Sequence, residues 1–152
     1  MEFFSKDEII NNKKIRIKLW DTAGQEQYKA LTKNFFRNSD GILIAFDLTH
    51  RKSFEKVNYW MESSLQNADS GIPIIILGNK VDLIRQVSQE EASKVAEGFK
   101  VKYFETSAKN NIGISEAIRE ITKQILLKEK DNEFKVSLVE EKGEEKESGC
   151  KC

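Results

Sequence analysis

The sequence predicts an α/β fold with a mostly parallel, doubly wound sheet. Two continuous apolar runs, at residues 41–47 and 73–78, are typical of strands that are covered on both faces. Helical stripes of apolar residues lie between and after these runs, and strands that alternate with helices indicate parallel βαβ units. The length of 152 residues is sufficient for one domain of this kind.

Composition and charge exclude several classes of protein. Lys and Arg together number 25, as do Asp and Glu, so no net charge favours nucleic acid as a partner. The sequence has no run of eighteen apolar residues and no signal-peptide pattern, so we expect neither a membrane-spanning helix nor secretion. Both cysteines lie within the last three residues, which excludes a disulfide framework and fits the cytosol.

Two further strands are predicted ahead of the apolar runs. They cover residues 3–10 and 14–20, and the two Asn residues between them favour a turn. In the second segment Ile15, Ile17 and Leu19 alternate with basic residues, which is the period of a half-buried strand. We therefore expect these two segments to form a β-hairpin.

Helices are predicted where apolar residues repeat every three or four positions. The first stripe comprises Phe54, Val57, Met61, Leu65 and Ala68. The last stripe comprises Ile114, Ala117, Ile118, Ile121 and Ile125. Between them, Ser88 and Glu91 have the spacing of a capping box at the start of a helix, and a short strand is expected at residues 101–105. From about residue 128 the periodicity stops, and the charged composition indicates a disordered tail.

An Asn-Lys-Val-Asp motif at residues 79–82 directly follows the second apolar run, and ligands of open α/β sheets bind beyond the carboxyl ends of the strands. The carboxylate of Asp82 could accept from the N1 and N2 hydrogens of guanine, whereas adenine offers no matching pair of donors. Asn79 would bond the base and brace a neighbouring loop, and the stem of Lys80 would lie along the base plane. The alternative is an ordinary polar turn between a strand and a helix.

A Thr-Ser-Ala-Lys motif at residues 106–109 follows the strand expected at 101–105. The backbone N–H of Ala108 would donate to O6 of guanine, Ser107 would hold the loop, and Lys109 would flank the base. Such a sequence alone is common in loops and at helix starts. In combination with the motif at residues 79–82, it indicates a site for guanine.

A Trp-Asp-Thr-Ala-Gly-Gln-Glu segment at residues 20–26 completes the set. With the three motifs in this order, the chain resembles a Ras-superfamily GTPase of the Rab type over residues 2–127. The resemblance implies a Ras-like P-loop NTPase fold, GTP or GDP with Mg²⁺ as ligands, and a switch role in vesicle traffic. It further implies that Asp21 holds Mg²⁺ through a water, that Gly24 contacts the γ-phosphate, and that Gln25 orients the attacking water.

Three aromatic residues match the surface with which Rab proteins contact effectors: Phe3, Trp20 and Phe35. Simple packing of the hairpin and core explains these residues equally well, and both interpretations stay open. Gln27 and Tyr28 depart from the Arg-Phe pair that is usual in Rabs. The resemblance also implies exchange factors, GTPase-activating proteins and a GDP-dissociation inhibitor as partners.

The sequence ends in Cys-Lys-Cys, with Gly149 in the fourth position from the end, so this is not a C-a-a-X box. It resembles the Cys-x-Cys ending of Rabs, which implies geranylgeranyl groups on Cys150 and Cys152 and a location in the cytosol and on the cytoplasmic face of endomembranes. Two lipids give stable anchoring where one gives only reversible binding. An apolar island at residues 134–139 would dock on the prenylation escort protein, unless it reflects random tail composition.

The predicted organisation is a small-GTPase domain at residues 1–127 and a tail at 128–152. Nowhere does the sequence contain Gly-x-x-x-x-Gly-Lys-Ser/Thr, the loop that grips phosphates. We therefore expect a domain truncated at its N-terminus, without the family's first strand, phosphate loop and first helix. Weak nucleotide binding, negligible hydrolysis and two open sheet edges should follow. A nucleotide-independent interaction module, or a decayed fragment, is the alternative.

Overall fold

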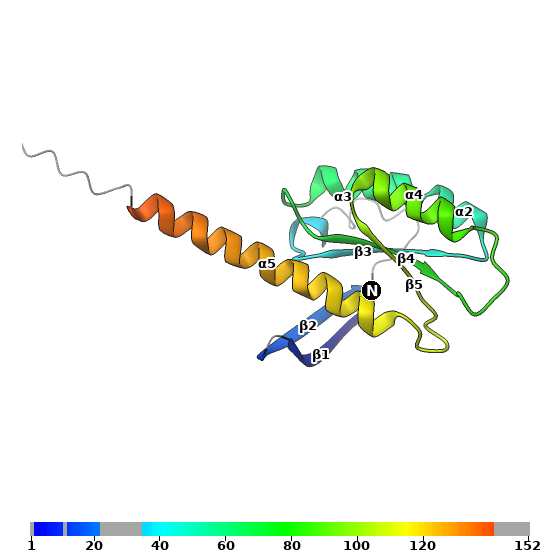
Figure 1. Cartoon of the computed structure of the whole chain (residues 1–152), viewed down its shortest axis with the longest axis horizontal. Coiled ribbons are helices and arrows are strands. Elements are labelled where there is room, and N and C mark those ends of the chain that lie inside the picture. The colour runs from blue at the N-terminus through cyan, green and yellow to red at the C-terminus, as the bar shows by residue number, and fades with distance from the viewer. Residues whose placement is uncertain (1, 11, 22–34, 142–152) are drawn as a thin grey trace, which may run out of the picture.

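The computed structural model of the chain describes residues 2–10, 12–21 and 35–141 (Figure 1). The strands are β1 (Glu2–Ile10), β2 (Lys13–Asp21), β3 (Ile42–Asp47), β4 (Ile74–Asn79) and β5 (Lys102–Glu105). The helices are α2 (Arg51–Glu55), α3 (Val57–Asn67), α4 (Gln89–Phe99) and α5 (Ile114–Glu141). Every predicted strand is present, and no strand end differs from its predicted position by more than one residue.

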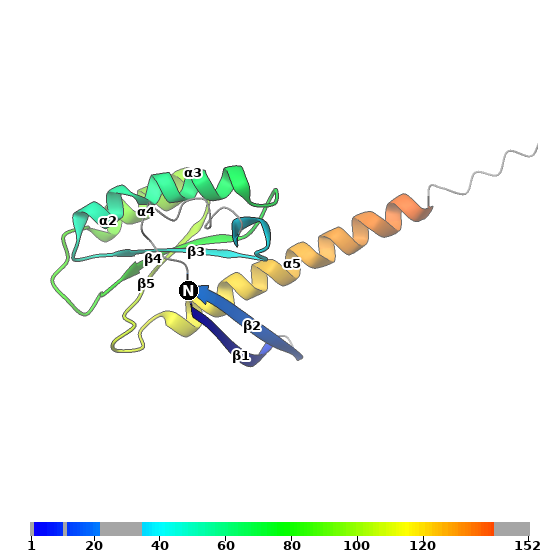
Figure 2. The ribbon, with the colours of Figure 1, turned by 180° about the vertical axis from the view of Figure 1, so that it is seen from behind.

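The centre of the molecule is a parallel sheet with the strand order β3-β4-β5. Ile42 lies opposite Ile74, and Ile76 lies opposite Tyr103. Both faces of β4 are apolar because both faces are covered: α2, α3 and α4 lie on one side of the sheet and α5 on the other (Figures 1 and 2). This arrangement confirms the predicted parallel α/β architecture.

The larger part of the core lies between the sheet and α3 and α4. Ile74 and Ile76 belong to this cluster together with Met61, which is fully buried. Ile75, also fully buried, alternates to the opposite face, where α5 covers the sheet. Each such side chain contributes about 1.5–3 kcal/mol through its removal from water.

The first predicted helical stripe is broken at Lys56, which separates α2 from α3. In α3 the side chains that face the sheet are Val57, Met61 and Ser64. Leu65 was predicted to join this stripe, but it is 57% exposed, because residue 64 rather than 65 continues the face set by Val57 and Met61. The buried hydroxyl of Ser64 donates to the carbonyl oxygen of Met61 at 2.8 Å, which removes the cost of burying it.

The predicted capping box is present at the start of α4. The Ser88 hydroxyl oxygen accepts from the N–H of Glu91 at 3.2 Å, and the Glu91 carboxylate accepts from the N–H of Ser88 at 3.1 Å. These two bonds satisfy donors that a helix start otherwise leaves unpaired. The loop that precedes α4 is therefore fixed where it enters the helix.

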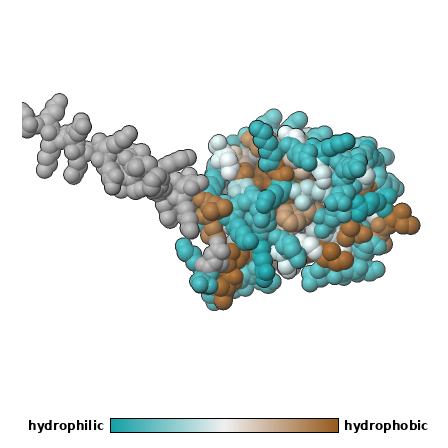
Figure 3. All heavy atoms as spheres, in the orientation of Figure 1, coloured by the Kyte–Doolittle hydropathy of each residue, from teal (hydrophilic) through white to brown (hydrophobic). Residues whose placement is uncertain are grey.

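β1 and β2 form an antiparallel hairpin that is a sheet of its own among the described residues. Asn12 adopts the left-handed conformation, with φ of 60°, that the tight turn requires and that Asn tolerates. Phe4 and Leu19 lie opposite each other and remain 55% and 44% exposed. In Figure 3, apolar side chains gather at the lower edge of the body, over this hairpin.

One edge of β3 is open in the described part of the chain. Alternate residues of β3 bond to β4, so the backbone groups of Leu43 and Ala45 point the other way, where no described strand pairs with them. At the end of the strand, the Ser53 hydroxyl accepts from the N–H of Asp47 at 3.0 Å. The separate hairpin and the open edge agree with the predicted gap in the sheet.

Replacing Ala45 by Lys should make the chain more soluble. Open apolar edges associate with one another, and a lysine on the edge blocks such pairing. Ala45 is exposed, so the longer side chain has room. We expect sedimentation velocity to show a larger monomer fraction than for the unsubstituted chain. Gln66→Lys adds the same charge on the exposed face of α3 and should have little effect; an equal gain from Gln66→Lys would show that net charge, not the edge, governs association.

α5 extends to Glu141, so the start of the segment predicted as a disordered tail, residues 128–141, is helical. The segment contains neither Gly nor Pro and is rich in Glu and Lys, which are good helix formers. Extension of an existing helix also avoids the cost of nucleation. Within the described ranges, no helix combines the length and the apolar character needed to cross a bilayer.

Candidate functional site

The motifs at residues 79–82 and 106–109 meet at the carboxyl edge of the sheet, where β4 and β5 end. The N–H of Thr106 donates to the carbonyl oxygen of Gly78 at 2.8 Å, and the N–H of Val81 donates to the carbonyl oxygen of Thr106 at 3.0 Å. These bonds continue the strand pairing into the loops. The two segments that the sequence analysis assigned to one site are thus held against each other.

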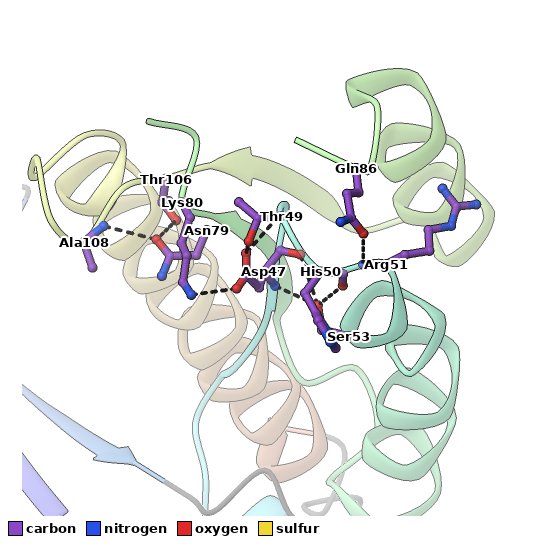
Figure 4. Close-up of polar contacts among 10 residues, drawn as sticks. All are labelled: Asp47, Thr49, His50, Arg51, Ser53, Asn79, Lys80, Gln86, Thr106 and Ala108. Carbon is purple, nitrogen blue, oxygen red and sulfur yellow. Dashed lines mark hydrogen bonds and ion pairs between the residues drawn. The ribbon is translucent and has the colours of Figure 1, made fainter. Parts of the chain in front are cut away.

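Asn79 braces the second loop. Its side-chain oxygen accepts from the N–H of Ala108 at 3.1 Å and from the hydroxyl of Thr106 at 3.4 Å (Figure 4). The structure therefore confirms the bracing role predicted for Asn79. It also shows that the N–H of Ala108 already has an acceptor, so donation from this group to a base requires a three-centre hydrogen bond.

Asp82 carries an ionised carboxylate at this edge. A hydrogen bond from the Ser107 hydroxyl lowers the pKa of Asp82 below its usual value, and the charges of Lys109 and Lys80 act in the same direction. The side chain is only partly buried. Asp82 therefore presents a negatively charged acceptor at neutral pH, as recognition of a pair of donors requires.

The loop around Ser107 is closed by its own backbone. Ser107 is fully buried and pairs with Ile112 through two backbone hydrogen bonds of 3.0 Å. Its hydroxyl oxygen accepts from the N–H of Asn110, also at 3.0 Å. Ala108 and Lys109 are exposed at the tip of this closed loop. The holding role predicted for Ser107 is confirmed by these bonds, while contact of Lys109 with a base stays a prediction.

Gly113 allows this loop to return to α5. It has φ of +69°, and a Cβ at this position would lie 2.3 Å from the carbonyl oxygen of Glu105. Any other residue would suffer both the left-handed backbone conformation and this contact. The glycine thus fixes the loop directly behind residues 106–109.

Lys80 has a left-handed backbone, with φ of 67°, and its ammonium group lies 2.7 Å from the Oδ2 atom of Asp47. Asp47 lies opposite Asn79 in the parallel register. Its Oδ1 atom accepts from the N–H and the hydroxyl of Thr49, at 2.8 and 2.7 Å. Burial raises the pKa of Asp47, but the hydrogen bonds from Lys80 and Thr49 outweigh burial and leave that pKa below its usual value.

A second ion pair joins the two loops from behind. The guanidinium group of Arg85 donates to both oxygens of Glu105, at 2.8 and 2.9 Å. The hydroxyl of Tyr103 donates to the same carboxylate at 3.1 Å. Arg85 follows Asp82 by three residues and Glu105 immediately precedes Thr106, so this bidentate pair sets the separation of the two motifs.

The Arg85 pair should make stability depend on pH. Its hydrogen bonds lower the pKa of Glu105 below the usual 4.5, against the opposing effect of burial. A carboxyl whose pKa is lowered by folding stabilises the fold above about pH 5, and the effect is lost as the pH falls through the folded-state pKa. We therefore expect Glu105→Gln to reduce the free energy of unfolding by about 1 kcal/mol at pH 7. Urea titrations at pH 7 and 3.5 should show this difference shrinking at the lower pH; a difference that stays constant would contradict the assignment.

Sequence reasoning did not single out Asp47, Arg85 or Glu105. A signal for Asp47 was present: it ends an apolar strand that neighbours the strand ending at Asn79, and such strand ends meet at one edge. The Arg85–Glu105 pair depends on how two loops pack against each other. The spacing of two such residues along the sequence does not predict their contact.

The remaining predicted site residues lie in the hairpin or beside it, or outside the described residues. Asp21 ends β2 and is exposed. The rings of Trp20 and Phe35 are 6.0 Å apart, so two of the three predicted effector-face residues are neighbours. The third, Phe3, lies in β1. Outside the described residues lie four predicted positions: Gly24, Gln25, Cys150 and Cys152.

The described residues contain no group of three His, Cys, Asp or Glu side chains that could hold a metal ion. Asp21 is the only residue among them that was predicted to serve Mg²⁺, an ion that proteins commonly bind through one or two carboxylates together with substrate phosphates. The polar cluster lies at the carboxyl edge of the parallel sheet, which is where α/β domains with open sheets bind their ligands.

Comparison with known proteins identifies the class. The model of the Ras family matches residues 1–127. Rat (Rattus norvegicus) Ras-related protein Rab-13 is 38% identical over 149 residues, which cover 94% of this chain and 73% of the relative. Ras-related protein Rab-2B of Dictyostelium discoideum is 39% identical, covering 87% of this chain and 66% of the relative.

GTP-binding protein ypt3 of Schizosaccharomyces pombe is likewise 39% identical, covering 82% of this chain and 59% of the relative. The chain thus spans between 59% and 73% of the length of these three relatives. The chain belongs to the Ras family of small GTPases and is of the Rab type. Its fold is accordingly the Ras-like α/β fold that the sequence predicted.

Proposed function

We propose that the chain acts as a Rab-type switch that binds guanine nucleotides, hydrolyses GTP to GDP and serves vesicle traffic. The observation that supports this most is the convergence of Asn79, Asp82 and Ser107 at one edge of the sheet. Asp82 would accept from N1 and N2 of guanine, Asn79 and Ala108 would contact the base edge, and Lys80 and Lys109 would flank its faces. One relative is itself named as GTP-binding.

We infer in addition that the 152 residues, taken as they stand, bind nucleotide weakly. Phosphate-loop residues would supply several charge-assisted hydrogen bonds of about 1.5–3 kcal/mol each, and every 1.4 kcal/mol is about tenfold in affinity. Gly24 and Gln25 would still contact the γ-phosphate and orient the attacking water. Without a phosphate grip, however, binding should be weaker by orders of magnitude and hydrolysis negligible.

The test is a titration of the chain with GDP and, in parallel, with ADP. The NMR chemical shifts of the backbone amides of Ser107 and Ala108 should change with GDP at concentrations well above micromolar. They should not change with ADP. Binding of GDP below one micromolar would refute the inference of weak binding. Equal responses to GDP and ADP would refute guanine recognition itself.

Partners and membrane attachment follow from the same proposal. Effectors, exchange factors, GTPase-activating proteins, the prenylation escort protein and the GDP-dissociation inhibitor would be the proteins it meets. Geranylgeranyl groups on Cys150 and Cys152 would hold it on the cytoplasmic face of endomembranes, exchanging with the cytosol. Replacing both cysteines by Ser should leave the chain in the bottom fraction after prenylation and liposome flotation; flotation of this variant would disprove the lipid anchor.

One observation favours a second candidate function, a nucleotide-independent interaction module. The half-exposed Trp20 ring beside Phe35 offers an aromatic surface near the end of β2. Aromatic side chains are enriched where proteins contact each other. If this module were the function, Asp82→Ala would leave partner binding intact while Trp20→Ala would abolish it.

A further inference from the structure

Asp47 is fixed in place by its own loop. Its N–H donates to the hydroxyl oxygen of Ser53 at 3.0 Å, and its carbonyl oxygen accepts from the N–H of His50, also at 3.0 Å. Thr49 occupies the Oδ1 atom with two hydrogen bonds. The carboxylate therefore cannot rotate freely, and its Oδ2 atom remains directed at Lys80.

Lys80 is held at both ends. Its carbonyl oxygen accepts from the N–H of Leu83 at 3.0 Å, and the preceding carbonyl, of Asn79, accepts from the N–H of Leu48 at 2.9 Å. Its ammonium group bonds to Asp47 at 2.7 Å. The four-carbon stem thus runs between two fixed points at the edge where Asn79 meets the second loop (Figure 4).

This ion pair contributes little to stability. The side chain of Lys80 is 49% exposed and that of Asp47 is 23% exposed. Pairs exposed to this degree typically contribute only a small fraction of the stability of a domain. Its main consequence is that it selects one conformation of a long side chain which would otherwise sample many.

We propose that Asp47 is a positioning residue for base recognition, which tethers Lys80 so that its stem forms one flat wall of the base site. The proposal rests on the proposed function, because it concerns the same site. Asp47 acts through Lys80 and does not touch the ligand. Thr49 supports it by keeping the carboxylate in the orientation that reaches Lys80.

The expected size of the effect follows from side-chain entropy. Ordering a lysine side chain costs about as much free energy as a tenfold change in affinity represents. In the tethered chain this ordering has already occurred before the ligand arrives. Asp47→Asn should therefore weaken binding by about three- to tenfold, and equally for GDP and guanosine, since the stem contacts the base and not the phosphates.

The tether itself can be tested without any ligand. Nitrogen-15 relaxation of the lysine ammonium groups should show Lys80 to be restricted compared with Lys94, which is exposed on α4. Asp47→Asn should make the two alike, while Asp40→Asn, an exposed carboxylate before β3, should change neither. If Lys80 is as mobile as Lys94 in the unsubstituted chain, the inference is overturned whatever the ligand results show.

The role of the tether is tested by a double-mutant cycle with GDP and guanosine. Lys80→Met keeps an unbranched stem but cannot bond to Asp47. We expect Asp47→Asn to weaken binding in the unsubstituted chain and to have no further effect in Lys80→Met. Additive losses would show that Asp47 does not act through Lys80, and tighter binding by Asp47→Asn would show that the ion pair blocks the site.

The two proposals fail in different ways. If neither GDP nor guanosine shows saturable binding to the unsubstituted chain, the proposed function falls, and the role of the tether falls with it. If both ligands bind and Asp47→Asn leaves their affinities unchanged, only the present inference falls. The relaxation measurement decides in either case whether the tether exists.

Discussion

A chain with alanine in place of Gly113 should unfold at a much lower urea concentration than the unsubstituted chain. The left-handed conformation at this position costs a residue with a Cβ about 1–2 kcal/mol. In addition, the Cβ would lie 2.3 Å from a backbone oxygen, that of Glu105, which cannot move without the strand that carries it. We expect a total loss of about 3–4 kcal/mol, measured by circular dichroism against urea.

Two other glycines provide matched controls. Gly71 has a similar φ, +70°, but a Cβ there meets nothing within 4 Å, so Gly71→Ala should cost only about 1 kcal/mol. Gly98 lies within α4, also in open space, and Gly98→Ala should stabilise the chain by about 0.5–1 kcal/mol. If Gly113→Ala were no more harmful than Gly71→Ala, the close packing of the loop against Glu105 would be wrong.

The second large effect is expected from Asp82→Ala, which should abolish the preference for guanine over adenine. The variant loses a charged acceptor for two donors of the base, and GDP binding should fall by at least about a hundredfold. The response to ADP should be unchanged, since adenine has no donor pair to lose. Amide shifts of Ala108 during parallel titrations with GDP and ADP measure both quantities.

Asp82 also accepts a hydrogen bond from Ser107, so the fold of the loop needs its own control. Asp82→Asn keeps the size of the side chain and an acceptor for Ser107, but loses the charge and one acceptor. Glu62→Gln removes a charge from the exposed face of α3 and should change nothing. Retention of the GDP preference by Asp82→Asn would mean that the carboxylate does not read the base.

The sequence predicted the strands well because their signals are local. Runs such as that at residues 73–78 can be apolar on both sides only if both faces are covered, and the parallel sheet follows from them. The alternation at Ile15 and Ile17 similarly required a half-buried hairpin. The division into two sheets was expected because the sequence shows no phosphate-loop motif and no strand ahead of it. No residue of the hairpin or of β3 indicates this division by itself.

Prediction was less successful where periodicity or composition is compatible with more than one structure. Periodicity did not mark the break at Lys56, and it placed Leu65 in the buried stripe, whereas within α3 Ser64 continues the face set by Val57 and Met61. The tail composition at residues 128–141 indicated disorder, yet the same residues are good helix formers when they extend α5. Local composition is compatible with both states, and only the preceding helix decides between them.

For the site, the sequence motifs identified residues that the structure brings together, but not all of the residues that hold them in place. Asn79, Asp82 and Ser107 lie in recognisable motifs, and the structure brings them together. Asp47 and the Arg85–Glu105 pair act across strand register and between loops. Such contacts depend on tertiary packing, which residue spacing along the chain does not encode.

At Lys80 the backbone conformation and the side chain favour different residues. For folding alone, glycine is the most favourable residue at φ of 67° and would relieve about 1 kcal/mol of conformational energy. Glycine would, however, remove the side chain that reaches Asp47. Selection for a more stable chain and selection for a more competent site therefore point to different residues at this position. A stability-optimised redesign that treats the backbone alone would choose the residue that removes the ion pair with Asp47.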